Sequence, residues 1–452
     1  MANTSVSPAR RTAFDILLKV AGGGFSSVLL ASEEPKLSPL DRSLCHELVL
    51  GVLRWQLRLD CIIEKFANRK VATLDEPVKV ALRLGLYQLR FLSRIPASAA
   101  VNESVNLVHL ARVSSARSFV NAVLRRASRE PDYDPVAEVS KPIERLSIET
   151  SHPLWLLERW SKRLGFDEAA ALARANNETP PTSFRILVGT DSAPAILERL
   201  IASGATVEPS KVVSDAWRVS GATSVLREMV ELGQVYLQDE ASQLVAHLLE
   251  AQAGEKVLDL CAAPGGKTTL IATRAHDQAL VIATDSSAQR LETLRLNVVH
   301  QRLRSVVPML LDGTVELPFA EPFDRVLVDA PCSGTGTLRH NPEIRWRISE
   351  ADIINLAAQQ KVLLKNAARV VKPGGRLIYS TCSVELEEND EVVADFLRST
   401  DEFRVVPPAK LVTESLAIRT WPQRHGTDGF FATIFERTFG VRRPGGALLS
   451  DH

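Results

Sequence analysis

Cysteine is scarce in this sequence of 452 residues, which contains only Cys45, Cys61, Cys261, Cys332 and Cys382. An odd number of widely spaced cysteines is a poor basis for a disulfide framework, so we expect free thiols and a reducing, cytoplasmic setting. No two cysteines form a CxxC pair, and no cysteine–histidine cluster has the spacing of zinc ligands. The sequence therefore predicts no metal site.

The sequence also lacks a long apolar run. No stretch approaches the roughly 18 apolar residues of a membrane-spanning helix. The N-terminal segment MANTSVSPARRTAFDILLKV has no signal-peptide core, because Asp15 and Lys19 interrupt it. Hydrophobic residues make up 45% of the chain and charged residues 24%, as is usual for globular proteins. We expect a soluble protein of two or three domains without a membrane partner.

The formal net charge is zero, but the charges are unevenly distributed. Residues 1–130 contain 19 Lys and Arg against 11 Asp and Glu, whereas the remainder contains 35 against 43. A basic first part is typical of proteins that bind a polyanion such as nucleic acid. A solvated basic surface without a ligand gives the same count, so the charge alone leaves both interpretations open.

The apolar pattern predicts three structural parts. Residues 1–140 have helical periodicity, and the stretch VKVALRLGLYQLRFL is apolar on nearly all sides, which predicts a central buried helix. Residues 145–235 combine short helices with short strands, including one at Arg185–Val188, and indicate a small α+β unit. In residues 236–440, short strands rich in Val, Ile and Leu alternate with helices that begin near Gly266, Ser287, Asn355 and Glu388. This alternation predicts a doubly wound, Rossmann-like parallel sheet.

Ligands of such sheets bind beyond the carboxyl ends of the strands, so the residues after each strand are the candidates. The first strand runs into DLCAAPGGKT, where small residues admit a ligand and the next helix offers free N–H groups. A P-loop would need glycine where Cys261 stands, and the stretch is not GxGxxG, which disfavours a nucleotide triphosphatase and a dinucleotide fold. Asp285 and Asp312 follow the next two strands and could accept hydrogen bonds from a ligand, although such residues often only cap a helix.

Cys332 and Cys382 follow the fourth and fifth strands, so both thiols should lie at the ligand-binding edge of the sheet. One reaction that needs such a thiol is methyl transfer to C5 of a cytosine. A thiolate that adds to C6 makes C5 nucleophilic enough to accept the methyl group. Asp329 would stabilise charge developing at N3, and the second thiol would assist loss of the C5 proton or release of the enzyme. Cys45 and Cys61 lie on apolar helical stretches and are expected to be buried and inert.

Several motifs resemble a known family. DLCAAPGGKT, VDAPCSGTGTLRHNPEIRW, YSTCSVELEEND, the tail DGFF and the segment YLQDEAS look like motifs of the RNA cytosine-5 methyltransferases of the Nol1/Nop2/Sun group. LSPLDRSLCHELVLGVLRW and SARSFVNAVLRRAS resemble the NusB-type RNA-binding domain. The combination is similar to the bacterial 16S rRNA methyltransferases of this group. In the middle part, FRILVG departs from the LRVN-like sequence of the family's RRM-like element, which weakens the expectation of RNA contacts there.

The resemblance implies a class I methyltransferase fold and a catalytic role for Cys382 as nucleophile, Cys332 as releasing thiol and Asp329. Around S-adenosylmethionine it implies Cys261, Ala262, Ala263, Pro264, Gly265, Gly266, Lys267, Asp285, Arg290, Asp312 and Asp329. We expect a monomeric enzyme that methylates C5 of a specific cytosine in 16S ribosomal RNA. The alternatives are a tRNA cytosine-C5 methyltransferase and a non-catalytic RNA-binding factor with a methyltransferase fold. A DNA methyltransferase is disfavoured, because the nucleophile lies one strand after the DAPC element.

Overall fold

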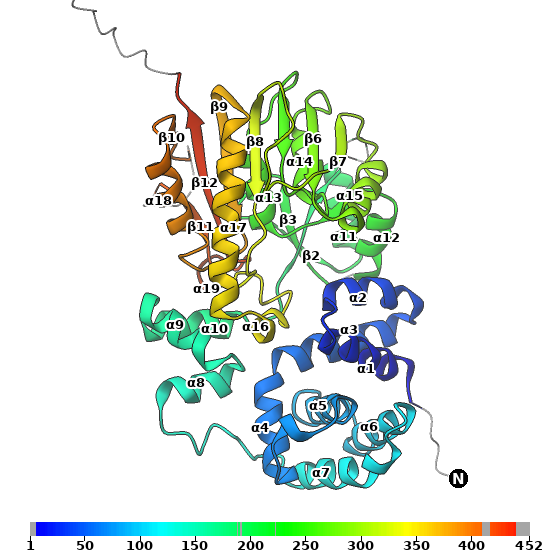
Figure 1. Ribbon diagram of the computed structural model, residues 1–452. Helices are drawn as coiled ribbons and strands as arrows, with labels where there is room; N and C mark the ends of the chain where they lie inside the picture. Colours follow the sequence, from blue (N-terminus) through cyan, green and yellow to red (C-terminus); the bar gives the residue numbers. More distant parts are fainter. Residues whose placement is uncertain (1–5, 188, 190–191, 222, 409–415, 440–452) are drawn as a thin grey trace, which may run out of the picture. The chain divides into compact units, whose positions relative to one another are not determined.

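The computed structural model describes residues 6–187, 189, 192–221, 223–408 and 416–439 (Figure 1). Contacts divide the chain into two compact units, Met1–Thr179 with Leu338–Arg347, and Pro180–Thr337 with Ile348–His452. The predicted fold class is confirmed, with a helical N-terminal part, a small α+β part and a C-terminal α/β sheet. The predicted domain boundaries between residues 140 and 236 stay a prediction. Among the described helices, none is long and apolar enough to cross a membrane.

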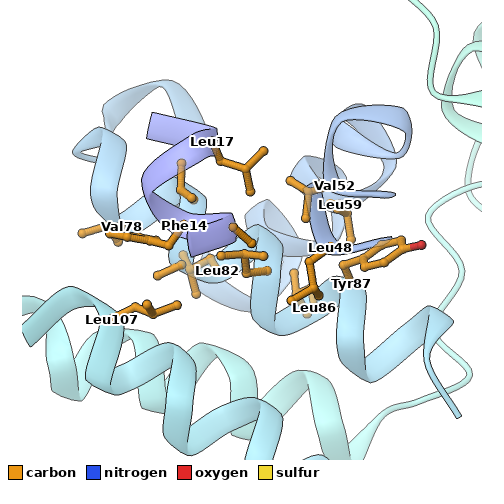
Figure 2. Close-up of a cluster of buried hydrophobic side chains, with 14 of the residues drawn as sticks. Phe14, Leu17, Leu48, Val52, Leu59, Val78, Leu82, Leu86, Tyr87 and Leu107 are labelled. Atoms are coloured by element: carbon orange, nitrogen blue, oxygen red, sulfur yellow. The ribbon is translucent and has the colours of Figure 1, made fainter. Parts of the chain in front are cut away.

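The first unit is helical, and its core surrounds α5 (Glu76–Phe91), which packs against five other helices. Figure 2 shows Leu82, Leu86 and Tyr87 of α5 among the buried side chains of its neighbours. The stretch that is apolar on nearly all sides is therefore the central helix, as predicted. The other helices are α1 (Pro8–Ala21), α2 (Ser26–Glu33), α3 (Pro39–Arg54), α4 (Gln56–Ala67), α6 (Ala97–Leu110), α7 (Arg117–Arg129), α8 (Pro142–Thr150), α9 (Leu154–Leu164) and α10 (Phe166–Ala175), with short 3₁₀ turns η1 (Glu34–Lys36), η2 (Val71–Thr73) and η3 (Ser114–Ala116).

A short stretch from much later in the sequence, Leu338–Arg347 with α16 (Ile344–Arg347), also belongs to the first unit. Arg345 is fully buried there, and its guanidinium donates to the carbonyl oxygen of Ser151 at 3.2 Å and to Oδ1 of Asn177 at 2.9 Å. Because a buried guanidinium needs hydrogen-bond acceptors, these contacts fix the stretch within the helical unit.

The small sheet of the second unit is antiparallel, in the order β2-β3-β1-β4. Phe184, Leu200 and Met229 form part of the core between this sheet and its two helices. The strand predicted at Arg185–Val188 instead runs over Thr182–Ile186, and Val188 lies outside the described residues. The elements are β1 (Thr182–Ile186), α11 (Ala193–Ala202), β2 (Thr206–Pro209), β3 (Ala216–Ser220), α12 (Thr223–Glu231) and β4 (Val235–Leu237).

The large sheet has the strand order β10-β12-β9-β8-β5-β6-β7, and β11 pairs with β12. The strands from β5 to β9 are parallel, whereas β12 runs antiparallel to β9. The chain reverses its direction of travel across the sheet at β5, so the switch point lies between β5 and β8. The strands are β5 (Lys256–Asp259), β6 (Leu280–Asp285), β7 (Val306–Leu310), β8 (Phe323–Asp329), β9 (Val371–Thr381), β10 (Phe403–Val405), β11 (Ile418–Thr420) and β12 (Phe430–Arg437).

Helices cover both faces of this sheet, because successive strand residues point to opposite faces. Leu327 packs with the cluster that contains residues of α13, α14 and α15, whereas Val326 and Val328 pack with the cluster of α17 and α18. The helices are α13 (Glu240–Leu248), α14 (Gly266–Arg274), α15 (Ala288–His300), α17 (Glu350–Arg369), α18 (Asp390–Ser399) and α19 (Pro422–His425).

The start that we predicted for α17, near Asn355, is wrong, because this helix begins at Glu350. Ser349 caps it, accepting from the backbone N–H of Asp352, whose carboxylate accepts from the N–H of Ser349. This reciprocal capping box satisfies two backbone donors and fixes the helix start five residues earlier.

Gly51 provides a test of the packing around α5. A Cβ added at Gly51 would lie 2.0 Å from Cζ of Tyr87, which is 3% exposed and stacked on Phe91 at a centroid distance of 5.0 Å. We expect Gly51→Ala to lower the free energy of unfolding by about 1–3 kcal/mol, because the confined ring cannot move away. Thermal unfolding followed by circular dichroism measures this. Gly22→Ala is the control, since a Cβ there is 3.5 Å from its nearest neighbour. Equal midpoints for both variants would contradict the packing.

Candidate active site

The two predicted catalytic thiols lie side by side. β8 and β9 are parallel neighbours in which Asp329 is paired with Ser380, so the residues just after both strands lie together. The Sγ atoms of Cys332 and Cys382 are 3.1 Å apart, and the backbone N–H of Cys382 lies 3.3 Å from Sγ of Cys332. Both cysteines are free and half-buried.

The hydrogen bond with Cys382, together with burial, raises the pKa of Cys332 well above its ordinary value. Cys332 is therefore a protonated thiol at rest, able to donate toward the neighbouring sulfur. Burial raises the pKa of Cys45 to about 12 and that of Cys61 to about 11. Cys45 is buried, as predicted, whereas Cys61 is only half-buried. Burial also raises the pKa of Cys261.

Two glycines hold the loop that carries Cys332 against the loop that carries Cys382. The N–H of Gly336 donates to the carbonyl oxygen of Cys382 at 3.0 Å. The N–H of Gly429 donates to the carbonyl oxygen of Gly336 at 2.8 Å. A Cβ on Gly336 would lie 2.0 Å from the carbonyl oxygen of Gly429, so no other residue fits. This close backbone approach accounts for a glycine in both the DAPCSGTG and the DGFF motifs.

A cavity of about 210 Å³ is lined by Asp329, the last residue of β8, three residues before Cys332. Asp259 lines it at the end of β5, fully buried, with Oδ2 accepting from Oγ1 of Thr268 at 2.7 Å. The other oxygen, Oδ1, is buried without a hydrogen-bond partner in the described part of the chain. Burial raises the pKa of Asp259 to about 7. The lining residues are Tyr236, Leu237, Gln238, Ser242, Asp259, Cys261, Ala262, Ala263, Pro264, Gly266, Lys267 and Asp329.

Lys267 connects the cavity to the thiols. Its Nζ donates to Oδ2 of Asp329 at 2.7 Å and lies 5.1 Å from the ring centroid of Phe430. Burial disfavours the ammonium and is the largest single effect. The charge of Asp329 and its hydrogen bond, together with electrostatic contributions from Cys382 and Asp259, outweigh burial, so the pKa of Lys267 is raised. Asp329 also accepts from Oγ of Ser380 at 2.8 Å. Lys267 is thus hydrogen-bonded to one carboxylate and interacts electrostatically with the Cys382 sulfur.

Three predicted cofactor residues lie elsewhere in the loop region. Asp285 is 3% exposed and accepts from the N–H groups of Ala263 at 3.3 Å and Ser287 at 2.9 Å. Arg290 lies 3.4 Å from Asp285 and donates to the carbonyl oxygen of Ala263 at 2.5 Å. Asp312 is exposed and accepts from Thr314 within its own turn, which lowers its pKa. Neither these three residues nor the predicted Gly265 line the cavity, and their roles stay predictions.

The apolar Leu237 and four polar lining residues were not among the predicted site residues; the polar residues are Asp259, Tyr236, Gln238 and Ser242. All four stand inside motifs already recognised, DLCAAPGGKT and YLQDEAS, but spacing alone does not tell which side chains face a cavity. A Cβ on Gly266 would lie 3.3 Å from the Tyr236 hydroxyl oxygen and from Nε2 of Gln238. The tight packing of these groups on Gly266 is therefore what brings YLQDEAS into the site.

The described residues contain no group of three or more His, Cys, Asp or Glu side chains that could hold a metal ion. The side chains at the site offer two thiols, two carboxylates and one ammonium.

Three families match successive parts of the chain. Residues 7–129 match the NusB family, residues 152–226 match the ferredoxin-like domain of the RsmF/B-like methyltransferases, and residues 246–436 match the family described as 16S rRNA methyltransferase RsmB/F.

Relatives match over nearly the whole length. The probable ribosomal RNA small subunit methyltransferase B of Bacillus subtilis is 33% identical over 446 residues, which are 95% of this chain and 98% of that protein. The ribosomal RNA small subunit methyltransferase B of Erwinia tasmaniensis is 35% identical, covering 91% of this chain and 94% of that protein. The crystal structure of PH0851 has a TM-score of 0.84 and 27% identity, and covers 96% of this chain and 99% of that one.

The unpartnered Oδ1 of Asp259 is expected to bind a cationic ligand group. We expect Asp259→Asn to weaken binding of S-adenosylmethionine about tenfold at neutral pH, roughly 1.4 kcal/mol, because the amide carries no charge. A bound cation favours the ionised acid, so wild-type affinity should fall below about pH 7, where the free protein's Asp259 is protonated, and the variant's should not. Calorimetric titration tests both points, with the exposed Asp401→Asn as control. Identical affinities and pH slopes for wild type and Asp259→Asn would contradict this assignment.

Proposed function

Since the chain belongs to the family of ribosomal RNA small subunit methyltransferase B, we propose that it transfers a methyl group from S-adenosylmethionine to C5 of a cytosine in 16S ribosomal RNA. The observation that carries the proposal is the pair of sulfur atoms 3.1 Å apart, together with a cavity that Asp329 and the buried Asp259 line. Methyl transfer to a nitrogen or oxygen needs no covalent nucleophile, whereas the weakly nucleophilic C5 of cytosine does. A close pair of half-buried thiols therefore supports a reaction at C5 rather than at a nitrogen or oxygen.

The residues around the cavity fit S-adenosylmethionine. The orphaned carboxylate oxygen of Asp259 suits an ammonium group, and the loop from Cys261 to Lys267 with the N-terminus of α14 suits a carboxylate. Asp285, at the end of β6, is the candidate for the ribose hydroxyls, with Arg290 beside it and Asp312 nearer the base. When bound, S-adenosylmethionine supplies an electrophilic methyl group.

In the proposed mechanism, the Cys382 thiolate adds to C6 of the flipped cytosine and forms a sulfur–carbon bond. The electron pair of the C5–C6 double bond then becomes available at C5, which is the atom that is methylated. Addition requires a proton or a strong hydrogen bond at N3. Asp329 is the proposed hydrogen-bonding group for N3, and the Lys267 ammonium bonded to it is a source of the proton.

Cys332 acts after methylation in this proposal. C5 then carries both a methyl group and a hydrogen. Loss of that proton re-forms the C5–C6 double bond while the bond between C6 and sulfur breaks, and a proton taken up at N3 returns to the pair of Asp329 and Lys267. Cys332, 3.1 Å from the leaving sulfur, can assist the loss of the proton and can donate to the departing Cys382. The raised pKa of Cys332 suits a group that stays protonated until this step.

The helical first unit is proposed to hold the RNA backbone. Arg125 and Arg129 of α7 are exposed, as are Arg69 and Arg94 before and after α5. Arginines of this kind neutralise phosphates without reading sequence, as expected for a protein that recognises folded RNA largely by shape. We propose the division predicted from the sequence, with an RNA-binding helical domain, a small α+β domain and a catalytic domain.

The proposed reaction is tested by bisulfite mapping of 16S ribosomal RNA from cells with and without the protein, together with transfer of labelled methyl groups in vitro. We expect one cytosine to lose its protection from deamination when the protein is absent, and the purified chain to restore it. Methylation found only in tRNA would show that tRNA, and not 16S ribosomal RNA, is the substrate. If no methyl group is transferred to any RNA, the protein is better explained as a non-catalytic RNA-binding factor.

The two cysteines are expected to give different defects. Cys382→Ala should abolish methylation, by a factor of about 10³ or more, while S-adenosylmethionine binding is retained, because the nucleophile is lost but the cavity is not. Cys332→Ala should accumulate an RNA–protein adduct that survives denaturing gels, because release is impaired. Cys45→Ala is the control for loss of a thiol. A Cys332→Ala protein that turns over normally and traps no RNA would contradict this division of labour.

A further inference from the structure

The turn between β9 and α18 buries a carboxylate that none of the steps above uses. Glu388 is 0% exposed and accepts four hydrogen bonds. Its Oε1 accepts from the backbone N–H of Ser333 at 2.8 Å and from Nε2 of Gln360 at 3.0 Å. Its Oε2 accepts from the hydroxyl of Ser333 at 2.5 Å and from that of Ser383. Four neutral donors thus satisfy a fully buried acid.

Two of the residues that donate to Glu388 are sequence neighbours of the two cysteines. Ser333 directly follows Cys332, and Ser383 directly follows Cys382. The two serine hydroxyls are also 3.0 Å apart. One carboxylate therefore joins the two loops that present the sulfur atoms, although Glu388 is bonded to neither sulfur.

Pro331, the residue before Cys332, is linked to Glu388 as well. Nε2 of Gln360, on α17, donates both to Oε1 of Glu388 and to the carbonyl oxygen of Pro331 at 2.8 Å. Gln360 is fully buried. The residues before and after Cys332 are thus fixed by one connected set of hydrogen bonds.

The neighbouring residue, Asn389, holds Cys382 in the same way. Its Oδ1 accepts from the hydroxyl of Thr381 at 2.6 Å, and its Nδ2 donates to the carbonyl oxygen of Ser383 at 2.9 Å. Both residues that flank Cys382 are therefore bonded to one buried amide.

We propose that Glu388 is a positioning residue that holds the Cys332 and Cys382 sulfur atoms at bonding distance by joining the two loops behind them. The consequence for catalysis rests on the proposed function, but the consequence for sulfur spacing does not. A displacement of about 1 Å at reacting atoms can slow a reaction on the order of 100-fold. The hydrogen bonds of Glu388 to the two loops can therefore affect turnover although Glu388 does not contact the substrate.

The role of the carboxylate is hydrogen bonding to both loops and not a charge that reacts. Glu388→Gln keeps an oxygen for the N–H donors of Ser333 and Gln360, and its amide can donate to the serine hydroxyls, which rotate to accept. Glu388→Ala removes all four bonds and leaves their donors buried without partners. The two variants therefore separate the position of the carboxylate from its charge.

The test measures the spacing of the sulfur atoms in the full-length protein with phenylarsine oxide, which bridges two thiols only when they are close. Protection of Cys332 and Cys382 from N-ethylmaleimide, read by peptide mass spectrometry, reports the bridge. We expect wild type and Glu388→Gln to be bridged equally and Glu388→Ala to need at least about tenfold more reagent. Glu391→Ala, which removes an exposed glutamate from the same helix start, should behave as wild type.

The same proteins are then assayed for methyl transfer to 16S ribosomal RNA. We expect Glu388→Ala to lower kcat on the order of 100-fold with unchanged affinity for S-adenosylmethionine, and Glu388→Gln to stay within about tenfold of wild type. Should Glu388→Ala fail to fold, Glu388→Asp replaces it, because its shorter side chain cannot reach both loops.

Unaltered bridging in folded Glu388→Ala or Glu388→Asp would overturn the inference, and so would Glu388→Gln being as defective as Glu388→Ala. If bridging depends on Glu388 but wild type methylates no cytosine, the proposed function fails while the positioning role stands.

Discussion

The parallel pairing of β8 with β9 is the constraint on which the candidate site depends. Asp329 is paired with Ser380, and β8 ends at Asp329 while β9 ends one residue after Ser380. The loops after them therefore start side by side, which brings Cys332 and Cys382 to a sulfur–sulfur distance of 3.1 Å. A shift of one residue in this register would point the paired side chains to the opposite face and separate the thiols.

The site places several ionisable groups largely out of water, and these groups differ in how far their polar atoms are satisfied. Lys267 and Asp329 form an ion pair, Glu388 has four neutral donors, and one oxygen of Asp259 has no partner in the described chain. A buried acid without full hydrogen bonding costs free energy, so Asp259 is the group that gains most from a bound cation. Burial of the apolar clusters on both faces of the sheet stabilises the fold and offsets the cost of burying these polar groups.

Much of the fold could be predicted from the sequence, because short apolar strands alternate with helices and α5 is apolar on nearly all sides. The juxtaposition of Cys332 and Cys382 followed from their places after neighbouring strands. The start of α17 was missed because the apolar pattern becomes visible later than the capping pair of Ser349 and Asp352. The apolar periodicity that predicts a helix carries no information about its cap.

The polar interior of the site could not be predicted in the same way. Glu388 stands among other acids in VELEEND, and nothing in that run indicates which side chain is buried. The contacts that decide it come from Ser333 and Gln360, 55 and 28 residues away along the chain. Gly336 and Gly429 are similar, since their close approach joins motifs that are distant in sequence. Long-range packing of this kind is not encoded in local periodicity.

The central claim is that Cys382 bonds to C6 of a cytosine while Cys332 stays free at that stage. The most direct measurement uses 16S ribosomal RNA that contains 5-fluorocytidine, because fluorine at C5 cannot leave as a proton does and the covalent complex persists. Digestion and tandem mass spectrometry then identify the peptide that carries the nucleotide. The account predicts a methylated 5-fluorocytidine attached to Cys382, and attachment to Cys332, or no attachment at all, would contradict it.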